Sequence, residues 1–376
     1  MNIAFLTSGH YPYDDRIFYN LAASLHKQNH NVEIVSSKID LINVSDGIRL
    51  TCFAGDNLSK RDKIFKFKER LDTIIPDVII CSEPLTILAA IQYNRKQNRK
   101  TRIVYDITEW YPSHKNLNPY KKLIRWAVFI KLLFFNILAS AYADSFIFGE
   151  WYKSVPYRIL YPRKSFIFTS YYPDLTLINH IKPELQEGKL RLTYSGKICL
   201  EKGYMNFFNI LKKLTESNKE LEIEVKIIGW YENLQDKKEC ENIVHSSIQN
   251  VTLTIFERQS FKNFLDLIKN TDIFLDLRSD NFENQHCLPI KLFYYAALGR
   301  PVIFSDLKAI RKEVEIDKFG FLVHPTDTEH IVKILVNYID DNQLYYNHCE
   351  KARYLTETSY NWQRIEPQFI KFITSS

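Results

Sequence analysis

Closely spaced cysteines are absent from this 376-residue sequence, which has six cysteines in all. The closest two, Cys52 and Cys81, are 29 positions apart, so no CxxC motif exists. This spacing argues against a zinc ribbon, an iron–sulfur centre and a disulfide scaffold. The first residues carry no basic stretch followed by a long apolar run, so we expect no signal peptide. Together these absences predict a protein of the reducing cytoplasm.

Glycine and proline are scarce, with 10 and 13 residues, which excludes collagen-like and linker-dominated chains. Two phosphate-binding glycine motifs are also missing: GxGxxG after the first predicted strand, and the P-loop pattern GxxxxGKS or GxxxxGKT. The first absence argues against a dinucleotide-dependent oxidoreductase and the second against a P-loop hydrolase. Apolar residues make up 45% of the chain, so it can bury full cores. At roughly 150 residues per domain, the length predicts two domains.

Acidic residues are under-represented in one half of the chain. Residues 1–175 contain 24 Lys and Arg against 16 Asp and Glu, whereas residues 176–376 contain 26 against 28. A basic half favours an anionic partner such as a membrane surface, a phosphate or a nucleic acid, although a solvated basic face gives the same count. No nucleic-acid-binding motif accompanies the charge, so we expect no nucleic-acid partner.

Strands and helices alternate along the first half. The uncharged run Ile3–Leu6 indicates a buried strand, and the following helix has apolar residues every four positions. Asp14 or Asp15 can cap that helix. Further strands are expected at 31–36, 77–81 and 102–105, and helices at 60–73 and from residue 84. This order implies βαβ units and hence a parallel sheet.

The stretch from Tyr120 to Ala143 is long, apolar and aromatic. Four basic residues interrupt it: Lys121, Lys122, Arg125 and Lys131. Its longest uncharged run, Leu132–Ala143, has 12 residues, against about 20 needed to span a bilayer. We therefore expect a helix that is buried or lies on a membrane surface, with burial the more common case, and not a spanning helix.

Residues 151–188 are rich in tyrosine and proline and are interpreted as the irregular boundary between domains. A second alternation follows. Strands are expected at 191–195, 223–228, 251–255, 273–277, 302–304 and 321–323, and helices at 203–216, 260–269, 288–298, 327–338 and 361–373. The predicted fold class is α/β, with two parallel-sheet domains facing a cleft. Ligands bind at the carboxyl ends of parallel strands, so that cleft is the expected site.

The strongest local signal is the segment from Tyr194 to Gly203, which follows a predicted strand and opens a helix. Lys197 and Lys202 flank this turn. A helix N-terminus presents free N–H groups and a partial positive charge, so a diphosphate placed there gains these donors and two ammonium groups. From spacing alone, two solvated loop lysines are an equally good interpretation.

A second signal runs from Asn284 to Pro301 and follows another predicted strand. Pro289 suits the first turn of a helix, and Gly299 suits the residue just past its end. A polar loop that feeds a helix after a strand can face a ligand. A plain βαβ connection has the same pattern, so this segment alone does not decide the matter.

These segments together resemble glycosyltransferase family 4, a large group of retaining, nucleotide-sugar-dependent enzymes. The resemblance runs along the whole chain, through residues 10–18, 105–112, Ser195-Gly196-Lys197 with Glu201-Lys202-Gly203, 288–303 and 319–323. It implies a GT-B fold of two Rossmann-like domains, with a basic pair for the donor diphosphate. It also implies a front-face transfer without a protein nucleophile, in which the leaving diphosphate takes the proton of the acceptor hydroxyl.

The sequence departs from the family pattern at several polar positions. The Glu that holds the donor ribose corresponds to Tyr294, and its companion Glu to His286 or Asn284. Two histidines of the family correspond to Ser82 and Thr108. Because lysines can stabilise a departing diphosphate without these groups, we favour an active enzyme with an altered donor pocket. A non-catalytic partner subunit and a GT-B sugar-nucleotide epimerase are the alternatives.

The resemblance and the strand ends together give a set of expected site residues. The catalytic residues are Lys197, Lys202, Glu83 and Glu109. The donor-binding residues are Gly9, Gly196, Asn284, His286, Leu288, Pro289, Lys291 and Tyr294, and the acceptor-binding residues are His10, Arg16, Ser82 and Thr108. Glu83 and Glu109 can instead cap the helices that follow them, Gly9 can be an ordinary turn glycine, and Arg16 a charge on a helix surface.

The expected domains are an acceptor-binding domain at 1–175, a nucleotide-sugar-binding domain at 176–358, and a last helix at 359–376 that crosses back to the first. The expected partners are a nucleotide-sugar donor, with UDP or GDP as its nucleotide, a glycan or lipid-linked acceptor, and a membrane surface contacted by the basic first domain. No metal or other cofactor is expected. The resulting hypothesis is a cytoplasmic enzyme, peripheral on the inner face of the cell membrane, that serves surface polysaccharide synthesis.

Overall fold

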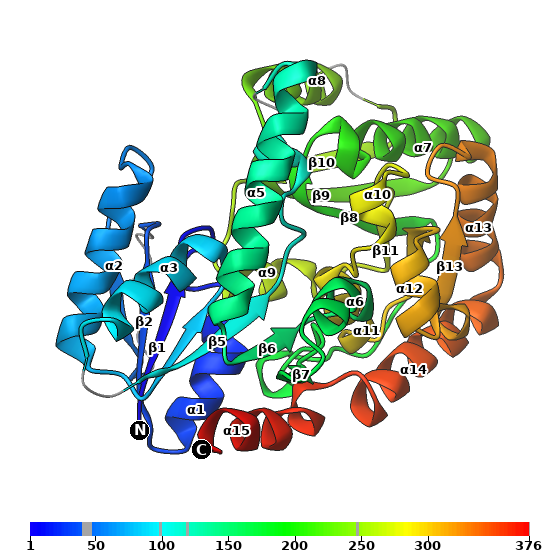
Figure 1. The fold of residues 1–376 in the computed structure, drawn as a ribbon. Coiled ribbons are helices and arrows are strands. Elements are labelled where there is room, and N and C mark those ends of the chain that lie inside the picture. The colour runs from blue at the N-terminus through cyan, green and yellow to red at the C-terminus, as the bar shows by residue number, and fades with distance from the viewer. Residues whose placement is uncertain (40–46, 98–99, 118–119, 246–247, 376) are drawn as a thin grey trace. The chain divides into compact units, whose positions relative to one another are not determined.

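The computed structural model describes residues 1–39, 47–97, 100–117, 120–245 and 248–375. Its internal contacts divide the chain into two compact units, which Figure 1 colours in chain order. Unit 1 consists of Met1–Tyr171 and Trp362–Ser376, and unit 2 of Tyr172–Asn361. The chain therefore passes once through unit 2 and ends in unit 1.

Unit 1 is built on seven parallel strands in the order β3-β2-β1-β4-β5-β6-β7. They are β1 (Asn2–Thr7), β2 (Asn31–Ser36), β3 (Arg49–Cys52), β4 (Val78–Cys81), β5 (Arg102–Ile107), β6 (Ser145–Phe148) and β7 (Ser165–Phe168). Ile3 pairs with Val32 on one side and with Val78 on the other, so β1 lies inside the sheet. The chain runs outward in both directions from β1 and β4. The carboxyl ends of these two strands therefore form the switch point at which such sheets bind ligands.

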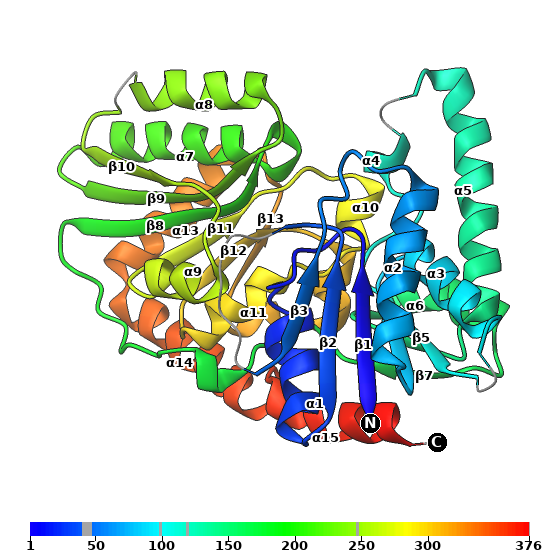
Figure 2. The same ribbon diagram turned by 90° about the vertical axis from the view of Figure 1, so that its left-hand side faces the viewer.

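Helices cover both faces of this sheet (Figure 2). Right-handed crossovers that run in opposite directions along a sheet place their helices on opposite faces. The connection from β1 to β2 carries η1 (Ile17–Ala22) and α1 (Ala23–Lys27) on one face. The other face carries α2 (Lys60–Ile74), α3 (Pro84–Asn94), α5 (Lys122–Tyr142) and α6 (Trp151–Leu160), with the short α4 (His114–Leu117) before α5.

The last residues of the chain pack on unit 1 through η5 (Trp362–Arg364) and α15 (Glu366–Thr374). The indole N–H of Trp362, which is 1% exposed, donates to the Ser24 hydroxyl at 2.8 Å. The Arg102 guanidinium donates to the carbonyl of Phe372 at 2.9 Å. A buried indole and a charged donor at the helix end hold this segment beside α1 and β5.

Unit 2 contains six parallel strands in the order β10-β9-β8-β11-β12-β13. They are β8 (Lys189–Ile198), β9 (Glu222–Tyr231), β10 (Val251–Phe256), β11 (Ile273–Asp276), β12 (Val302–Ser305) and β13 (Gly320–Val323). The helices are η3 (Leu200–Lys202), α7 (Tyr204–Ser217), α8 (Leu234–His245), α9 (Phe261–Ile268), α10 (Phe282–Gln285), α11 (Ile290–Ala297), α12 (Lys308–Glu313), η4 (Ile316–Lys318), α13 (Thr328–Asp340) and α14 (Asn342–Thr358). Here the switch point lies between β8 and β11. Two parallel-sheet α/β units confirm the predicted fold class.

Residues 151–188 are not irregular throughout, contrary to the expectation. They begin with α6 and β7, and the irregular part follows Phe168 and includes only η2 (Leu175–Leu177). Pro156 lies inside α6. A proline within a helix removes a backbone donor and disguises the helical pattern in the sequence.

Of the two alternatives expected for the helix at 120–143, burial, the favoured one, is wrong for most of α5. Among its described side chains, only Asn136, Ala139 and Ser140 are buried. Large apolar side chains such as Trp126 and Phe134 are 68% and 67% exposed. By length and composition alone, Ile124–Tyr142 is the one span among the described residues that could cross a membrane.

Candidate functional site

Charged side chains gather in unit 2 where β8 and β11 end. Asp276 closes β11 and is 5% exposed, and Arg278 donates to both its carboxylate oxygens at 2.8 and 2.5 Å. The ammonium of Lys291, in the first turn of α11, lies 3.5 Å from the same carboxylate and donates to the Ser195 carbonyl. One buried carboxylate is therefore flanked by two cations, which leaves an excess of positive charge at the switch point.

The pKa values of this cluster follow from burial and from the neighbouring charges. Burial alone would raise the pKa of Asp276, but Arg278 and Lys291 outweigh it and hold that pKa well below its usual range. Burial lowers the pKa of Lys291 to about 8, with Asp276 opposing the shift and Arg278 adding to it. The Lys291 ammonium is therefore charged at neutral pH and loses its proton in mildly alkaline solution.

Lys202 lies in the turn that follows β8. Its ammonium donates to Asn284 Oδ1 at 2.8 Å and lies 3.2 Å from a Glu201 carboxylate oxygen. The next residue, Gly203, has φ +79°, and a Cβ there would lie 1.9 Å from the carbonyl oxygen of Leu277. Only glycine permits this approach, so Gly203 brings the turn after β8 against the end of β11.

Lys197 has a different partner. It is still within β8, and its ammonium pairs with Glu232, both side chains being partly exposed. The two lysines that the sequence groups as one basic pair thus contact different residues, Lys202 through Asn284 and Lys197 through Glu232. Gly196 has φ +106°, and a Cβ there would lie 3.0 Å from the Lys291 ammonium.

The segment before α11 is an ordered turn. Asn284 is 2% exposed, and its amide nitrogen donates to the Ser279 carbonyl at 2.8 Å. His286 Nδ1 lies 2.8 Å from the Phe282 carbonyl oxygen, so this ring contacts its own turn. Leu288 is buried, and Pro289 caps α11, next to the first turn that its sequence pattern suggests. Gly299 has φ +64° just beyond α11, as its sequence position predicts.

Tyr294 belongs to an aromatic cluster. It is 3% exposed on α11, and its ring centroid lies 5.1 Å from that of Phe261 and 6.4 Å from that of Phe264. This is the position at which the resemblance implies a carboxylate. An aromatic ring, packed by two others, takes the place of a charge.

Glu83 organises the switch point of unit 1. Its carboxylate accepts hydrogen bonds from the Thr7 hydroxyl at 2.9 Å and from the N–H groups of Ser8 and Gly9 at 2.7 and 2.9 Å. A Cβ at Gly9 would lie 2.9 Å from Glu83 Oε1, so the glycine lets the loop approach the carboxylate. Burial raises the pKa of Glu83, opposed by His10 and by these donors. Glu83 also precedes α3, where the Thr86 hydroxyl contacts its backbone, so it occupies the cap position as well.

His10 and Asp14 form an ion pair in the loop after β1. His10 Nδ1 lies 2.9 Å from Asp14 Oδ2, and Nε2 lies 3.4 Å from the Thr108 hydroxyl. Burial alone would lower the pKa of His10, but the Asp14 carboxylate outweighs it, with help from Glu83 and Glu109, and raises the pKa to about 10. The ring is therefore an imidazolium at neutral pH, and its Nε2 is a donor beside the end of β5.

Arg16 is buried and is not a charge on the helix surface. It is 3% exposed, its guanidinium donates to both Asp106 oxygens at 2.5 and 2.7 Å, and it donates to the Thr169 hydroxyl at 2.7 Å.

Ser82 is 7% exposed, and its N–H donates to the Leu6 carbonyl at 3.1 Å, which joins the ends of β4 and β1. Unit 1 therefore brings Gly9, His10, Ser82, Glu83 and Thr108 to one edge, with exposed Glu109 following Thr108.

Sequence reasoning missed Asp276, Arg278, Asp106 and Asp14 as members of these clusters. A signal for two of them was present, because Asp106 is the last residue but one of β5 and Asp276 is the last residue of β11, and the neighbouring residues of both strands are buried. A carboxylate buried in such a strand needs a cationic partner. The sequence does not predict which cation pairs with the carboxylate, because Arg16 and Asp106 are 90 residues apart.

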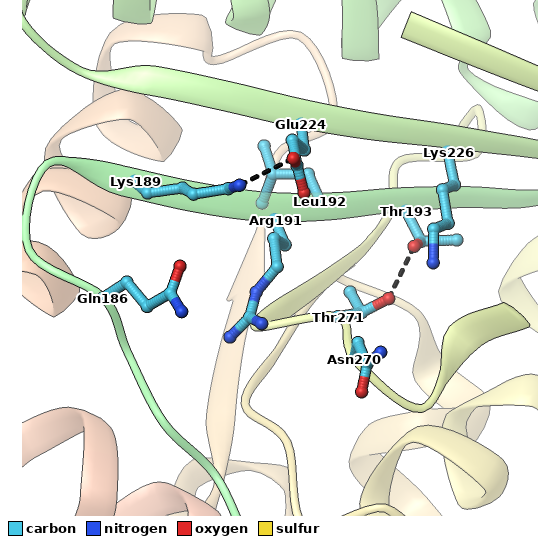
Figure 3. A pocket seen from close by; sticks show the side chains of 9 residues that line it. All are labelled: Gln186, Lys189, Arg191, Leu192, Thr193, Glu224, Lys226, Asn270 and Thr271. Carbon is cyan, nitrogen blue, oxygen red and sulfur yellow. Dashed lines mark hydrogen bonds and ion pairs between the residues drawn. The ribbon is translucent and has the colours of Figure 1, made fainter. Parts of the chain in front are cut away.

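A cavity of about 220 Å³ in unit 2 lies at the opposite edge of the sheet (Figure 3). It is lined from the amino-terminal part of β8, from β9 and from the turn before β11. Its charged side chains are engaged: Lys189 pairs with Glu224 at 2.6 Å, and Arg191 pairs with Asp272 at 2.7 Å. These pairs lie away from the switch point and tie neighbouring strands together.

A protein-family model matches most of unit 2. Residues 178–362 match the model of the family Glycosyl transferases group 1. No curated protein sequence matched this chain. The matched region contains both ends of the Lys202–Asn284 contact and the Asp276–Arg278–Lys291 cluster. The charged switch point therefore lies within the region that matches this family model.

Solved structures share the fold of the whole chain. Sucrose-phosphate synthase from Thermosynechococcus elongatus is 14% identical with a TM-score of 0.74, covering 98% of this chain and 97% of that one. WaaG, a glycosyltransferase involved in lipopolysaccharide biosynthesis, is 14% identical with a TM-score of 0.72 and full coverage of both chains. Anabaena HepE in complex with UDP-glucose is 14% identical with a TM-score of 0.70, covering 100% and 99%. At this identity they establish the fold, and the GT-B prediction is confirmed.

Proposed function

We propose that the protein is a retaining glycosyltransferase that moves a sugar from a nucleoside diphosphate sugar to a glycan acceptor. The observation that carries this proposal is the cationic cluster at the switch point of unit 2, within the glycosyltransferase group 1 match. A diphosphate carries the opposite charge and fits the carboxyl ends of parallel strands. The acceptor we propose is a lipid-linked saccharide used in surface polysaccharide synthesis.

Lys202 and Lys291 are the proposed diphosphate ligands. Both side chains are partly exposed, and Gly196 leaves room beside Lys291. Lys197 can join them once it leaves Glu232, because both side chains of that pair are partly exposed and water weakens such pairs. Ammonium groups at the phosphates supply the charge that a divalent cation supplies elsewhere. We therefore propose a reaction without a metal or other cofactor.

Asn284 positions the Lys202 ammonium, and Leu288 and Pro289 fix the start of α11 that carries Lys291. Tyr294, near the proposed ribose, offers a ring and a hydroxyl where the resemblance implies a carboxylate, and His286 flanks the sugar. UDP or GDP is the proposed nucleotide. The HepE complex with UDP-glucose, in a protein of the same fold, favours UDP.

The acceptor is assigned to the switch point of unit 1. The His10 imidazolium and the Thr108 and Ser82 hydroxyls offer donors there, and exposed Glu109 offers an acceptor. Glu83 positions the loop that carries Gly9 and His10. Arg16 also positions this loop, since its guanidinium donates hydrogen bonds to Asp106 and Thr169.

The proposed step forms a bond between the acceptor oxygen and the anomeric carbon while the bond from that carbon to the diphosphate breaks. The acceptor proton passes to a diphosphate oxygen, and the new bond forms on the face that the diphosphate leaves. Lys202 and Lys291 stabilise the charge that develops on the departing oxygen. A stronger contact in the transition state than in the ground state is what accelerates such a step.

The protein is proposed to work in the cytoplasm on the inner surface of the cell membrane, where a lipid-linked acceptor is presented.

The replacement of the ribose carboxylate by Tyr294 favours one second candidate, a non-catalytic partner subunit that keeps the fold without the donor. Thermal unfolding with UDP, GDP, ADP, CMP and NAD separates the two. A ligand at 100 times its dissociation constant adds about 2.7 kcal/mol, so a real donor raises the unfolding temperature.

If one nucleoside diphosphate stabilises the chain, a partner subunit without a donor site is excluded and the donor base is identified. If none of the five changes the unfolding temperature, the donor pocket is non-functional and the partner-subunit candidate replaces the proposal.

A further inference from the structure

A row of large apolar side chains lies exposed along α5. It consists of Trp126, Ile130, Phe134, Leu138 and Tyr142, each at least 44% exposed. Residues four apart are neighbours on a helix surface, so these five side chains form one continuous row. Soluble proteins rarely expose apolar surface in such contiguous form without a partner.

The opposite side of α5 is anchored in unit 1. The Asn136 amide donates to the Tyr157 hydroxyl at 2.9 Å and accepts from the Tyr105 hydroxyl at 3.2 Å. Lys164 donates to the Ser140 carbonyl at 2.9 Å. A spanning helix would have to break these contacts and carry Asn136 into hydrocarbon. The row is therefore presented on an anchored helix.

A basic groove lies in the same helical layer, between α2 and α3. It has a volume of about 640 Å³ and is lined by Arg61, Ile64, Phe65, Lys68, Gln92, Arg95 and Lys96. Four of these seven residues are cations, and none is acidic. Phe65 is 65% exposed at its edge. Helix α3 contacts both α2 and α5, and Figures 1 and 2 show the three helices side by side.

The stretch of sequence that contains α5 carries charge of one sign. Between Glu109 and Asp144 the sequence has no Asp or Glu, but it has five basic residues: Lys115, Lys121, Lys122, Arg125 and Lys131. Basic residues beside an apolar row suit an interface that is anionic at its surface and apolar just beneath. A second protein copy would need a matching acidic rim.

We propose that the outer surface of the α2–α3–α5 layer docks on an anionic lipid bilayer. The apolar row of α5 enters the boundary between headgroups and acyl chains, and the basic groove receives anionic headgroups. The helix lies in the plane of the interface and does not cross it. This inference deepens the membrane partner of the proposed function, and its test does not depend on catalysis.

The test is sedimentation of the full chain with vesicles of phosphatidylcholine, alone or mixed with phosphatidylglycerol. We expect strong binding only to the mixed vesicles, weakened by salt because screening reduces attraction between the charges. A double variant, Trp126→Ser with Phe134→Ser, removes two exposed side chains and should bind at least about tenfold more weakly, given the transfer energy of buried apolar groups. Its matched control is Leu234→Ser with Tyr354→Ser, which removes exposed apolar side chains in unit 2.

The groove is tested by Arg61→Gln with Arg95→Gln. Each basic residue near an anionic surface contributes about 1 kcal/mol, so this pair should weaken binding about 30-fold. Lys237→Gln with Lys238→Gln, on α8, is the charge control and should leave binding unchanged. Nucleotide-induced thermal stabilisation should be the same in all four variants.

Equal binding to both vesicle types, or no effect of either test variant, would overturn the proposal. So would wild-type protein that resists extraction from vesicles by alkaline carbonate, because a spanning helix resists it and an interfacial one does not. A dimer that falls apart in the Trp126 and Phe134 variant, with no lipid binding, would assign the row to a second copy. Vesicle binding without any nucleotide effect would leave this inference standing and remove the proposed function.

Discussion

Removal of the Lys202 ammonium should weaken nucleoside diphosphate binding more than it weakens the fold. In Lys202→Met the side chain keeps its length and loses its charge and its hydrogen bond to Asn284 Oδ1. Asn284 retains its bond to the Ser279 carbonyl, and Gly203 still shapes the turn. The loss of this hydrogen bond should therefore cost about 1.5 kcal/mol of folding stability, the lower end for a bond to a charged group, because the Lys202 side chain is partly exposed.

The expected effect on binding is larger. A hydrogen bond to a charged group contributes about 1.5–3 kcal/mol, and each 1.36 kcal/mol is tenfold, so the dissociation constant should rise about 10- to 150-fold. The assay is isothermal titration calorimetry with the nucleoside diphosphate that stabilises the wild type. Lys197→Met should show a smaller rise, because a ligand must first displace Glu232 from that ammonium.

The matched control is Lys237→Met. This lysine lies on α8 and pairs with Glu241 four residues later at 3.8 Å, outside the switch point. It should bind nucleotide as the wild type does. The reasoning is refuted if Lys202→Met binds within twofold of the wild type, or if Lys237→Met loses as much affinity.

Three further predictions concern pH and backbone geometry. Nucleotide affinity should fall as pH rises through about 8, since Lys291 then loses its charge, and Lys291→Arg should flatten that dependence in the same calorimetric titration. The folded-state pKa of His10 is about 10, above its usual value of 6.5. The ion pair of His10 therefore contributes fully to the free energy of unfolding below about pH 6.5, and this contribution is lost as pH rises through 10. Urea unfolding of His10→Asn should show a smaller loss of unfolding free energy over that pH range than the wild type shows. Gly203→Ala should unfold at a markedly lower urea concentration than Gly188→Ala. Both glycines have positive φ, which costs an alanine about 1–2 kcal/mol. Only at Gly203 would the new Cβ also lie 1.9 Å from a carbonyl oxygen.

The sequence predicts the four shorter strands of unit 2 well because each is a short run of mostly apolar residues or alternates apolar with polar ones, whereas β8 and β9 extend to ten residues, beyond the expected 191–195 and 223–228. The expected 302–304 and 251–255, for example, differ from β12 and β10 by one residue each. Pro289 and Gly299 mark the limits of α11 for a local reason, the backbone freedom that each residue type allows. Signals of this kind need no knowledge of distant contacts.

The partners of charged residues could not be predicted in the same way. Lys197 and Lys202 are close in sequence, yet one pairs with Glu232 and the other with Asn284, 35 and 82 residues away. Whether α5 is buried or lies at a surface was left open by the sequence for a related reason. A helix with apolar residues on most sides does not reveal which side the rest of the fold covers, and here the anchoring side is set by Asn136 and Ser140.

Sugar transfer itself is the most direct test of the central claim. The purified chain is incubated with UDP- and GDP-sugars and with membrane lipids that carry saccharide acceptors, and free nucleotide and glycosylated lipid are measured together. The account predicts that one donor yields nucleoside diphosphate and glycolipid in equal amounts, with the anomeric configuration of the donor kept in the product. If a nucleoside diphosphate binds but no donor is consumed, or if the product has the inverted configuration, the account of a retaining glycosyltransferase is contradicted.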